Sequence, residues 1–291
     1  MKGLIVVNAY SKNEEYLYQS KRMQQEFRKL GVETDIIVNN SFLFMISDNS
    51  IYPRISRCDF CVYWDKDKYI LSMMEKYGIP VFNRYKAIMD CDDKMTTYIE
   101  LSNKGFPLPK TLPGLLCYRD DEIVADSTID KVEILGYPLI IKESYGSLGN
   151  GVYLINNRFE LKETMNIVKC KPHLFQEFIK TSYGRDLRII VIGGKAIGGM
   201  LRTGGDNDFR SNIGAGGSGK SYPLTPALEE LAIGIANALD LDYCGIDVLF
   251  GKDGPVICEV NSNAFFFSFE KATGINVAKI YAEHIIKSVN A

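Results

Sequence analysis

The sequence predicts an α/β protein whose C-terminal lobes are of the α+β class, and three observations support this prediction. Between residues 4 and 82, short apolar strands alternate with helical segments, which is typical of a parallel sheet covered by helices. From residue 187 onward the chain is rich in strands, interrupted by one helix and closed by another. The length of 291 residues, 46% of them apolar and 24% charged, is enough for two or three compact lobes.

The first of these lobes is predicted to contain a small parallel sheet. Four apolar runs have the length of strands, at residues 4–7, 34–38, 60–64 and 80–82. Helices are expected at residues 14–30 and 69–77, and the first should bury Leu17, Met23, Phe27 and Leu30. The loop after the first strand, residues 8–11, lacks glycine, which argues against a dinucleotide-binding turn.

The middle of the chain alternates between helices and strands. Residues 84–104 have a helical pattern that ends at Pro107 and Pro109. Further on we expect a strand at residues 135–142, a glycine-rich loop at 146–151 and a second strand at 152–155. A helix at 158–170 and an apolar strand at 174–179 follow.

The last part of the chain is predicted to be mainly β-structure. Its expected strands lie at residues 187–192, 195–202, 243–250 and 256–261. A helix interrupts them, with Thr225 as N-cap and Pro226 at its first position, and a last helix covers residues 277–289.

Composition excludes several functional classes. The formal charge of −2 provides no basic field for nucleic acid or an anionic membrane. No apolar run approaches the roughly 20 residues that a membrane span needs, and the N-terminus is too short for a signal-peptide core. We therefore expect a soluble cytoplasmic protein with neither a nucleic-acid nor a membrane partner.

The seven cysteines are expected to be structural. Cys117, Cys170, Cys244 and Cys258 lie in apolar surroundings and are predicted to be buried. A second group, the Cys-x-x-Cys pair at residues 58–61, has no second pair elsewhere, and two histidines offer few ligands for zinc.

Residues 214–221 match the P-loop pattern G-x-x-x-x-G-K-S, but their surroundings argue against a P-loop. No apolar strand precedes the loop, and Pro223 and Pro226 prevent a helix from starting at Lys220. We interpret the segment as a glycine-rich loop near an active site, with a plain surface loop as the alternative.

Two lysines and a second glycine-rich loop suggest a phosphate site. Lys94 opens a helix after Asp93, and Lys142 closes an apolar strand, where an unpaired ammonium would be costly. The loop that follows contains Gly146 and Gly149, whose backbone can approach phosphates closely. A simple hairpin turn is the alternative.

Three oxygen-bearing side chains near the C-terminus suggest a metal site. Glu259 and Asn261 share one face of a strand, while Cys258 and Val260 are expected to point the other way. If the preceding strand pairs with this one, Asp247 joins them and forms an incomplete oxygen set that suits Mg²⁺. The alternative is a solvated sheet face.

Two further features are weaker. The strand with Gln176, Glu177, Phe178 and Ile179 runs out into a polar loop and could flank an adenine ring, although a core strand is the alternative. Arg188, Arg202 and Arg210 suggest an anion site, with surface ion pairs as the alternative.

In order and spacing these features resemble the ATP-grasp superfamily. The similarity is greatest to its RimK branch, the carboxylate–amine ligases that add glutamate to the C-terminus of a ribosomal protein. It covers nearly the whole chain and is densest from Asp93 onward, through Gln176–Ile179, Asp186–Arg188, 208–212, 245–248 and 259–261. The resemblance implies an ATP-grasp fold, with a pre-ATP-grasp α/β domain at residues 1–90, a small lobe at 91–180 and a C-terminal lobe at 181–291.

The resemblance also implies roles for individual residues. Lys94 and Lys142 would hold the α- and β-phosphates of ATP together with the Gly146–Gly149 loop. Gln176 to Ile179 would lie at the adenine, and Asp186 at the ribose. Arg210, Ser211 and Asn212 would lie near the γ-phosphate and the acyl group, with Arg210 and Asn212 as catalytic residues. The metal, Mg²⁺ or Mn²⁺, would be held by Asp247, Glu259 and Asn261.

The implied reaction joins a carboxylate of a small molecule or peptide to the amine of an amino acid through an acyl phosphate. Glutamate is the expected amine, because Arg188 and Arg202 could bind its carboxylates, and the branch favours a homo-oligomer. Residues 262–270 depart from the serine–proline–glycine turn of RimK, and this difference bears on the substrate more than on the reaction. An acid–thiol ligase, a kinase and a non-catalytic ATP-binding module are the alternatives.

Overall fold

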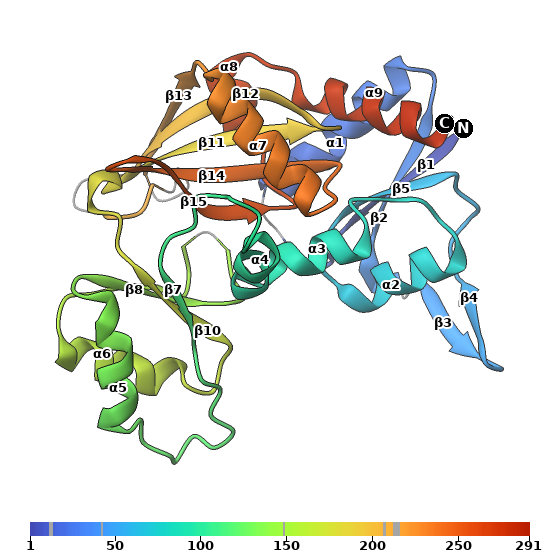
Figure 1. Cartoon of the computed structure of the whole chain (residues 1–291). Coiled ribbons are helices and arrows are strands. Elements are labelled where there is room, and N and C mark those ends of the chain that lie inside the picture. The colour runs from blue at the N-terminus through green and yellow to red at the C-terminus, as the bar shows by residue number, and fades with distance from the viewer. Residues whose placement is uncertain (12–13, 42, 148, 206–207, 212–215) are drawn as a thin grey trace.

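A computed structural model describes residues 1–11, 14–41, 43–147, 149–205, 208–211 and 216–291 of the chain. Figure 1 shows three lobes, and in the described part they are built on a four-stranded, a second four-stranded and a five-stranded sheet, with one additional hairpin.

The first sheet is parallel, with strand order β2-β1-β5-β6. Its strands are β1 (Lys2–Val7), β2 (Glu33–Val38), β5 (Phe60–Trp64) and β6 (Val81–Phe82). Helices α1 (Glu14–Lys29) and α2 (Lys68–Tyr77) cover it. This confirms the strand and helix alternation. The hairpin of β3 (Phe44–Ser47) and β4 (Ser50–Pro53) was not predicted.

The predicted face of α1 is half wrong. Met23 and Phe27 are buried, but Leu17 is 45% exposed and Leu30 is 39% exposed. Gln19 and Glu26 are buried in their place, because α1 packs its polar stripe against the C-terminal helices α8 (Phe267–Thr273) and α9 (Val277–Val289).

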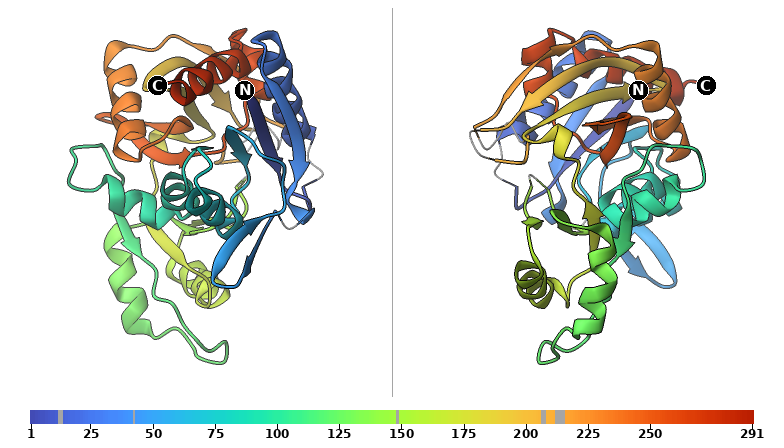
Figure 2. Two further views of the ribbon diagram at one scale, coloured as in Figure 1. Left: turned by 90° about the vertical axis from the view of Figure 1, so that its right-hand side faces the viewer. Right: turned by 60° about the vertical axis from the view of Figure 1, so that its left-hand side comes forward.

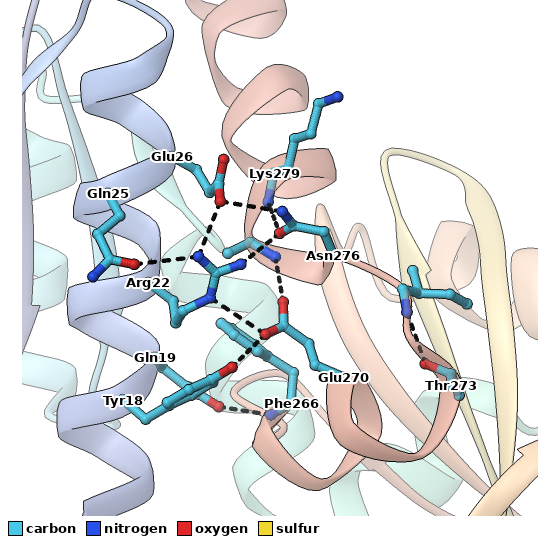
Figure 3. A network of polar contacts seen from close by, with 12 residues as sticks. Tyr18, Gln19, Arg22, Gln25, Glu26, Phe266, Glu270, Thr273, Asn276 and Lys279 are labelled. Carbon is cyan, nitrogen blue, oxygen red and sulfur yellow. Dashed lines mark hydrogen bonds and ion pairs between the residues drawn. The ribbon is translucent and has the colours of Figure 1, made fainter.

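Figure 3 shows the polar network that joins these helices. Arg22 of α1 donates to Glu26 at 2.9 Å, to Asn276 at 2.8 Å and to Glu270 at 3.4 Å. The Tyr18 hydroxyl donates to the same Glu270 carboxylate at 2.5 Å. The N-terminal sheet is therefore tied to the end of the chain.

Two helices lead from the first lobe to the second. The predicted helical stretch is divided into α3 (Tyr85–Asp92) and α4 (Lys94–Leu101), and the Asp93 carboxylate caps α4 by accepting from the backbone N–H groups of Met95 and Thr96. The predicted start of a helix after Asp93 is confirmed.

The second lobe is a sheet of order β7-β10-β8-β9 with two helices. Its elements are β7 (Thr111–Pro113), α5 (Asp126–Val132), β8 (Leu139–Glu143), β9 (Val152–Ile155), α6 (Arg158–Val168) and β10 (His173–Glu177). The strand expected from residue 135 starts later, because residues 133–135 form a 3₁₀ turn. β7 and α5 were not predicted.

The third lobe is an antiparallel sheet of order β13-β12-β11-β14-β15. Its elements are β11 (Arg185–Ile192), β12 (Lys195–Thr203), β13 (Ser218–Tyr222), α7 (Pro226–Ala238), β14 (Tyr243–Gly251) and β15 (Gly254–Asn261). The predicted cap of α7 by Thr225 and the bounds of α9 are confirmed. Lys220 lies in a strand, as the argument against a P-loop requires.

The third sheet has two different faces. One packs on α7, and the other shares a core with the N-terminal sheet, α8 and α9, as Figure 2 shows from two sides. In this shared core Trp64 packs edge-on against Tyr243, Phe266 and Tyr281. Toward its other end the same face becomes polar, and the candidate site lies there.

Other predictions have mixed outcomes. All seven cysteines are free, and Cys244 is buried as expected, but Cys170 is exposed at the end of α6, so that prediction is wrong. Cys117 and Cys258 are only partly buried. Among the described helices, none has both the length and the apolar character that crossing a membrane requires.

Candidate active site

A cleft of about 870 Å³ lies between the second and third lobes. Its walls come from α4, β8 and the glycine loop on one side and from β11, β12, β14 and β15 on the other. Most of the side chains predicted for the site line it: Lys94, Lys142, Gly146, Gly149, Gln176, Glu177, Phe178, Ile179, Asp186, Arg202, Arg210, Ser211, Asp247 and Glu259.

The two lysines enter the cleft from different elements, α4 and β8, and end at adjacent residues of β15. Lys94 is buried in the first turn of α4, where its Nζ donates to the Gly146 carbonyl at 2.9 Å and lies 3.4 Å from a Glu259 oxygen. The buried Lys142 reaches the Cys258 carbonyl at 3.5 Å. Two ammonium groups therefore meet at consecutive residues of one strand.

The environment of Lys142 keeps it charged. Burial would lower the pKa of Lys142, but the negative charge of the nearby Glu259 carboxylate opposes this effect, and the pKa is raised. Conversely, burial raises the pKa of the Cys258 thiol to about 11, so the thiol stays protonated at neutral pH.

A bulge in β15 corrects the prediction that Cys258 points away from the site. Asp247 stands opposite Glu259, but Val248 stands opposite Ile257, so Cys258 is an extra residue without a partner in the register. Because the alternation is interrupted there, Cys258 lines the cleft together with Glu259, whereas Val260 enters the core as expected.

Asp247 lies at the centre of an ion-pair network on the polar face. Arg188 donates to both of its oxygens at 2.8 Å, and Arg202 lies 2.8 Å from one of them. Burial would raise the pKa of Asp247, but Arg188 and Arg202 together lower it. Arg202 also binds both oxygens of Asp186, at 2.7 and 2.5 Å, and its pKa is raised despite burial by Asp247 and Asp186.

The predicted metal ligands lie close together. Pairing of β14 with β15 sets Asp247 opposite Glu259 and Gly245 opposite Asn261, and the Asn261 amide lies 3.4 Å from Asp247. Glu259 is the more accessible of the two carboxylates, with 28% of its side chain exposed against 5% for Asp247. Among the described residues no group of three or more His, Cys, Asp or Glu side chains has the arrangement of a metal site. Two carboxylates and an amide suit a hard cation that retains waters and phosphate ligands.

The segment after β10 provides a flat, partly apolar wall. The strand ends at Glu177, whose carboxylate accepts from the Lys110 backbone N–H at 2.8 Å, and the chain then turns outward. Phe178 packs edge-on against Tyr183 and Phe209. Gln176 donates to Thr111 at 2.9 Å, which fixes the inner end of the wall.

Arg210 closes the cleft from the third lobe. Its guanidinium is bound by Asp208 at 3.0 Å and donates to the Gly149 carbonyl at 3.2 Å, so it bridges to the glycine loop. Gly146 and Gly149 both have positive φ, 139° and 79°, which favours glycine. The Ser211 hydroxyl donates to Asp186 at 2.5 Å. Asn212 lies outside the described residues.

Two predicted residues lie beside the cleft and not in its wall. Within the described chain, the lining includes neither Arg188, which turns toward Asp247, nor Asn261. Sequence reasoning also missed three residues that complete the site: Tyr98, Phe209 and Cys258. Tyr98 could have been found, because it lies four residues after Lys94 and thus on the same face of α4.

Comparison with known proteins agrees with this arrangement. A family model described as a RimK-like ATP-grasp domain matches residues 91–285. Beta-citrylglutamate synthase B of Danio rerio is 37% identical over 242 residues, which cover 81% of this chain and 58% of that protein. The probable alpha-L-glutamate ligase 2 of Pseudoalteromonas atlantica is 31% identical over 292 residues, covering 94% of this chain and 92% of that protein.

A solved structure shares the fold along its whole length. The ATP-grasp ligase PsnB, complexed with minimal precursor, Mg and ADP, has a TM-score of 0.71 at 16% identity and covers 99% of this chain and 98% of that one. The chain spans little more than half the length of the Danio rerio synthase.

Proposed function

The chain belongs to the RimK-like ATP-grasp family, and we propose that it is an ATP-dependent ligase that joins a carboxylate to an amine. One observation carries the proposal. Lys94 and Lys142, from different elements, bring their ammonium groups to the adjacent residues Glu259 and Cys258 at the floor of one cleft. Two converging, buried cations are suited to binding a polyphosphate. The positive charge of Arg210 is then left for the reacting end of that polyphosphate.

The cleft offers a distinct position to each part of ATP. Gln176, Glu177, Phe178 and Ile179 would flank the adenine, and Asp186 with Ser211 would lie at the ribose. Lys94, Lys142 and the loop at Gly146 and Gly149 would bind the α- and β-phosphates. The contact of Arg210 with the Gly149 carbonyl brings the guanidinium over the phosphate loop, which supports a γ-phosphate beside it.

Asp247, Glu259 and Asn261 would hold Mg²⁺, with Mn²⁺ as a substitute. Their oxygens fit a hard cation, and the two arginines on Asp247 orient its carboxylate and keep it ionised. The ion would supply charge neutralisation at the β- and γ-phosphates. The relative PsnB is described with Mg and ADP, which supports this choice.

The proposed reaction has two steps. A carboxylate oxygen attacks the γ-phosphorus, the bond to the β-phosphate oxygen breaks, and ADP leaves with an acyl phosphate formed. The neutral amine then attacks the acyl carbon, the C–N bond forms, and phosphate leaves together with the N–H proton. Arg210 would stabilise the tetrahedral oxyanion between attack and departure.

Glutamate is the amine that we propose. The relatives include a beta-citrylglutamate synthase and a probable alpha-L-glutamate ligase, and both names contain glutamate. Arg188 and Arg202 are largely satisfied by Asp186 and Asp247, so they are better placed to fix the acidic face than to bind a free carboxylate. The carboxylate substrate would be a small acid such as citrate or the end of a peptide. We also propose the division into lobes at residues 1–90, 91–180 and 181–291.

The test is a product screen with ATP, Mg²⁺, glutamate or another amino acid, and a panel of carboxylic acids. Phosphate release together with an amide, identified by mass spectrometry, is the expected result. A phosphorylated alcohol would indicate a kinase, and a thioester an acid–thiol ligase. ATP binding without turnover for any pair would leave the non-catalytic module as the better account.

A further inference from the structure

Tyr98 is a buried side chain that reaches the phosphate-binding end of the cleft without lining it. It is 5% exposed, and its hydroxyl donates to the Cys258 carbonyl at 2.5 Å. Lys142 reaches the same carbonyl at 3.5 Å, so the hydroxyl and the ammonium share one acceptor. Cys258 is the bulge residue of β15. Its carbonyl therefore accepts from donors on two different elements, α4 and β8.

The position of Tyr98 on α4 links it to the other lysine. Tyr98 follows Lys94 by one helical turn, so both side chains project from the same face of a helix capped by Asp93. Lys94 reaches Glu259 and Tyr98 reaches Cys258, which are neighbours on β15. Helix α4 thus fixes the position of the Lys94 ammonium along β15 directly, and it fixes that of the Lys142 ammonium through the Tyr98 hydroxyl.

The hydroxyl of Tyr98 donates to the Cys258 carbonyl of β15, so it acts at the phosphate end of the cleft. Hydrophobic packing alone would be satisfied by phenylalanine, so the hydroxyl needs a separate reason.

We propose that Tyr98 is a positioning residue for nucleotide binding, whose hydroxyl holds the Lys142 ammonium in register with Lys94 along the triphosphate. This inference rests on the proposed ATP site and adds a residue to it. The hydroxyl touches no reacting atom. It fixes the Cys258 carbonyl on which the flexible lysine rests, while the lysine also lies 3.9 Å from the Cys258 sulfur. Less conformational entropy is then lost when ATP binds, because the lysine side chain is already ordered.

The experiment measures binding by calorimetry with ATP, ADP and adenosine as probes, on the full chain. Tyr98→Phe removes one oxygen and is expected to weaken ATP and ADP about tenfold, the effect of losing one hydrogen bond near a charge. Adenosine, which has no phosphate, should bind as it does to the wild type. Tyr243→Phe is the matched control, because Tyr243 is equally buried and donates to the Ala264 carbonyl at 2.6 Å in the core away from the cleft.

A second comparison separates positioning from general loosening. In a Lys142→Met background, Tyr98→Phe should produce no further loss of ATP affinity, because its effect passes through the lysine. Unchanged ATP affinity in Tyr98→Phe, equal losses for ATP and adenosine, or additive losses with Lys142→Met would each overturn the inference. A wild-type chain that binds neither ATP nor ADP would overturn the proposed function as well, so the two failures are distinguishable.

Discussion

Arg188 and Asp247 face each other across neighbouring strands and are joined by two hydrogen bonds of 2.8 Å. Because Arg202 binds the same carboxylate as well, Asp247 is held ionised and in one orientation before any ligand arrives. A buried acid fixed in this way belongs to a preorganised polar site, and it explains why Arg188 turns away from the cleft.

Arg188→Met should destabilise the protein by about 3 kcal/mol, since it leaves a buried carboxylate short of a bidentate partner. Urea unfolding measures the loss. Arg84→Met is the control, because Arg84 pairs with Asp240 at the surface, where both side chains are more than half exposed. That change should cost less than about 1 kcal/mol. Losses of equal size in the two variants would contradict the account of the network.

Asp247→Asn combined with Glu259→Gln should abolish ATP consumption that depends on Mg²⁺, because both carboxylates proposed for the ion are lost. Phosphate release titrated with Mg²⁺ provides the measurement. Asp253→Asn, an exposed acid at the far end of the same β14–β15 hairpin, should behave as the wild type. If the double variant keeps its magnesium-dependent activity, the metal lies elsewhere.

Arg210→Ala should lower turnover by about 10²–10³ while ATP affinity changes little, as expected for a donor to a developing oxyanion. Steady-state kinetics and calorimetry together separate the two effects. Arg210→Lys keeps the charge but loses the paired contacts with Asp208, so it should recover only part of the rate. Turnover near the wild-type value in Arg210→Ala would remove this residue from the mechanism.

Glu26 gives a pH prediction for the junction between α1 and α9. Burial would raise its pKa, but hydrogen bonds from Asn276, Lys29 and Arg22 lower it from 4.5 to about 2. A depressed folded pKa stabilises the protein above pH 4.5, and this contribution is lost as the pH falls toward 2. Glu26→Gln should lower the free energy of unfolding by about 1–3 kcal/mol at pH 7. The stability of this variant should vary less between pH 4.5 and pH 2 than that of the wild type.

Free energies of unfolding at pH 7 and pH 3 test this prediction. The difference between the wild type and Glu26→Gln should narrow at pH 3. A difference that stays constant with pH would mean that Glu26 acts through shape and not through charge.

Much of the fold could be predicted because its signals are local. Short apolar runs predicted the strands near residues 139–142, 187–192 and 256–261, and Thr225 with Pro226 predicted the start of α7. The ATP-grasp fold, expected from the ordered motifs, is confirmed by the solved neighbours. The short helix α8 was missed because the aromatic run at residues 265–269 has no clear period.

The rest of the site depends on pairing that a sequence does not specify. The alternation that predicted Glu259 and Asn261 on one face also placed Cys258 on the other, and a one-residue bulge reversed that result. Arg188 and Arg202 carry the charge expected of an anion site, but their partners are the protein's own Asp186 and Asp247. The prediction that Leu17 and Leu30 are buried was wrong because α1 buries a polar stripe against α9.

The central claim is that carboxylate activation passes through an acyl phosphate in this cleft, and isotope transfer tests it most directly. The carboxylic acid found in the product screen is labelled with ¹⁸O on both carboxylate oxygens and incubated with ATP, Mg²⁺ and the amine. The account predicts that one labelled oxygen appears in the released phosphate and the other remains in the amide. Released phosphate that contains no label, alongside an amide product, would contradict it.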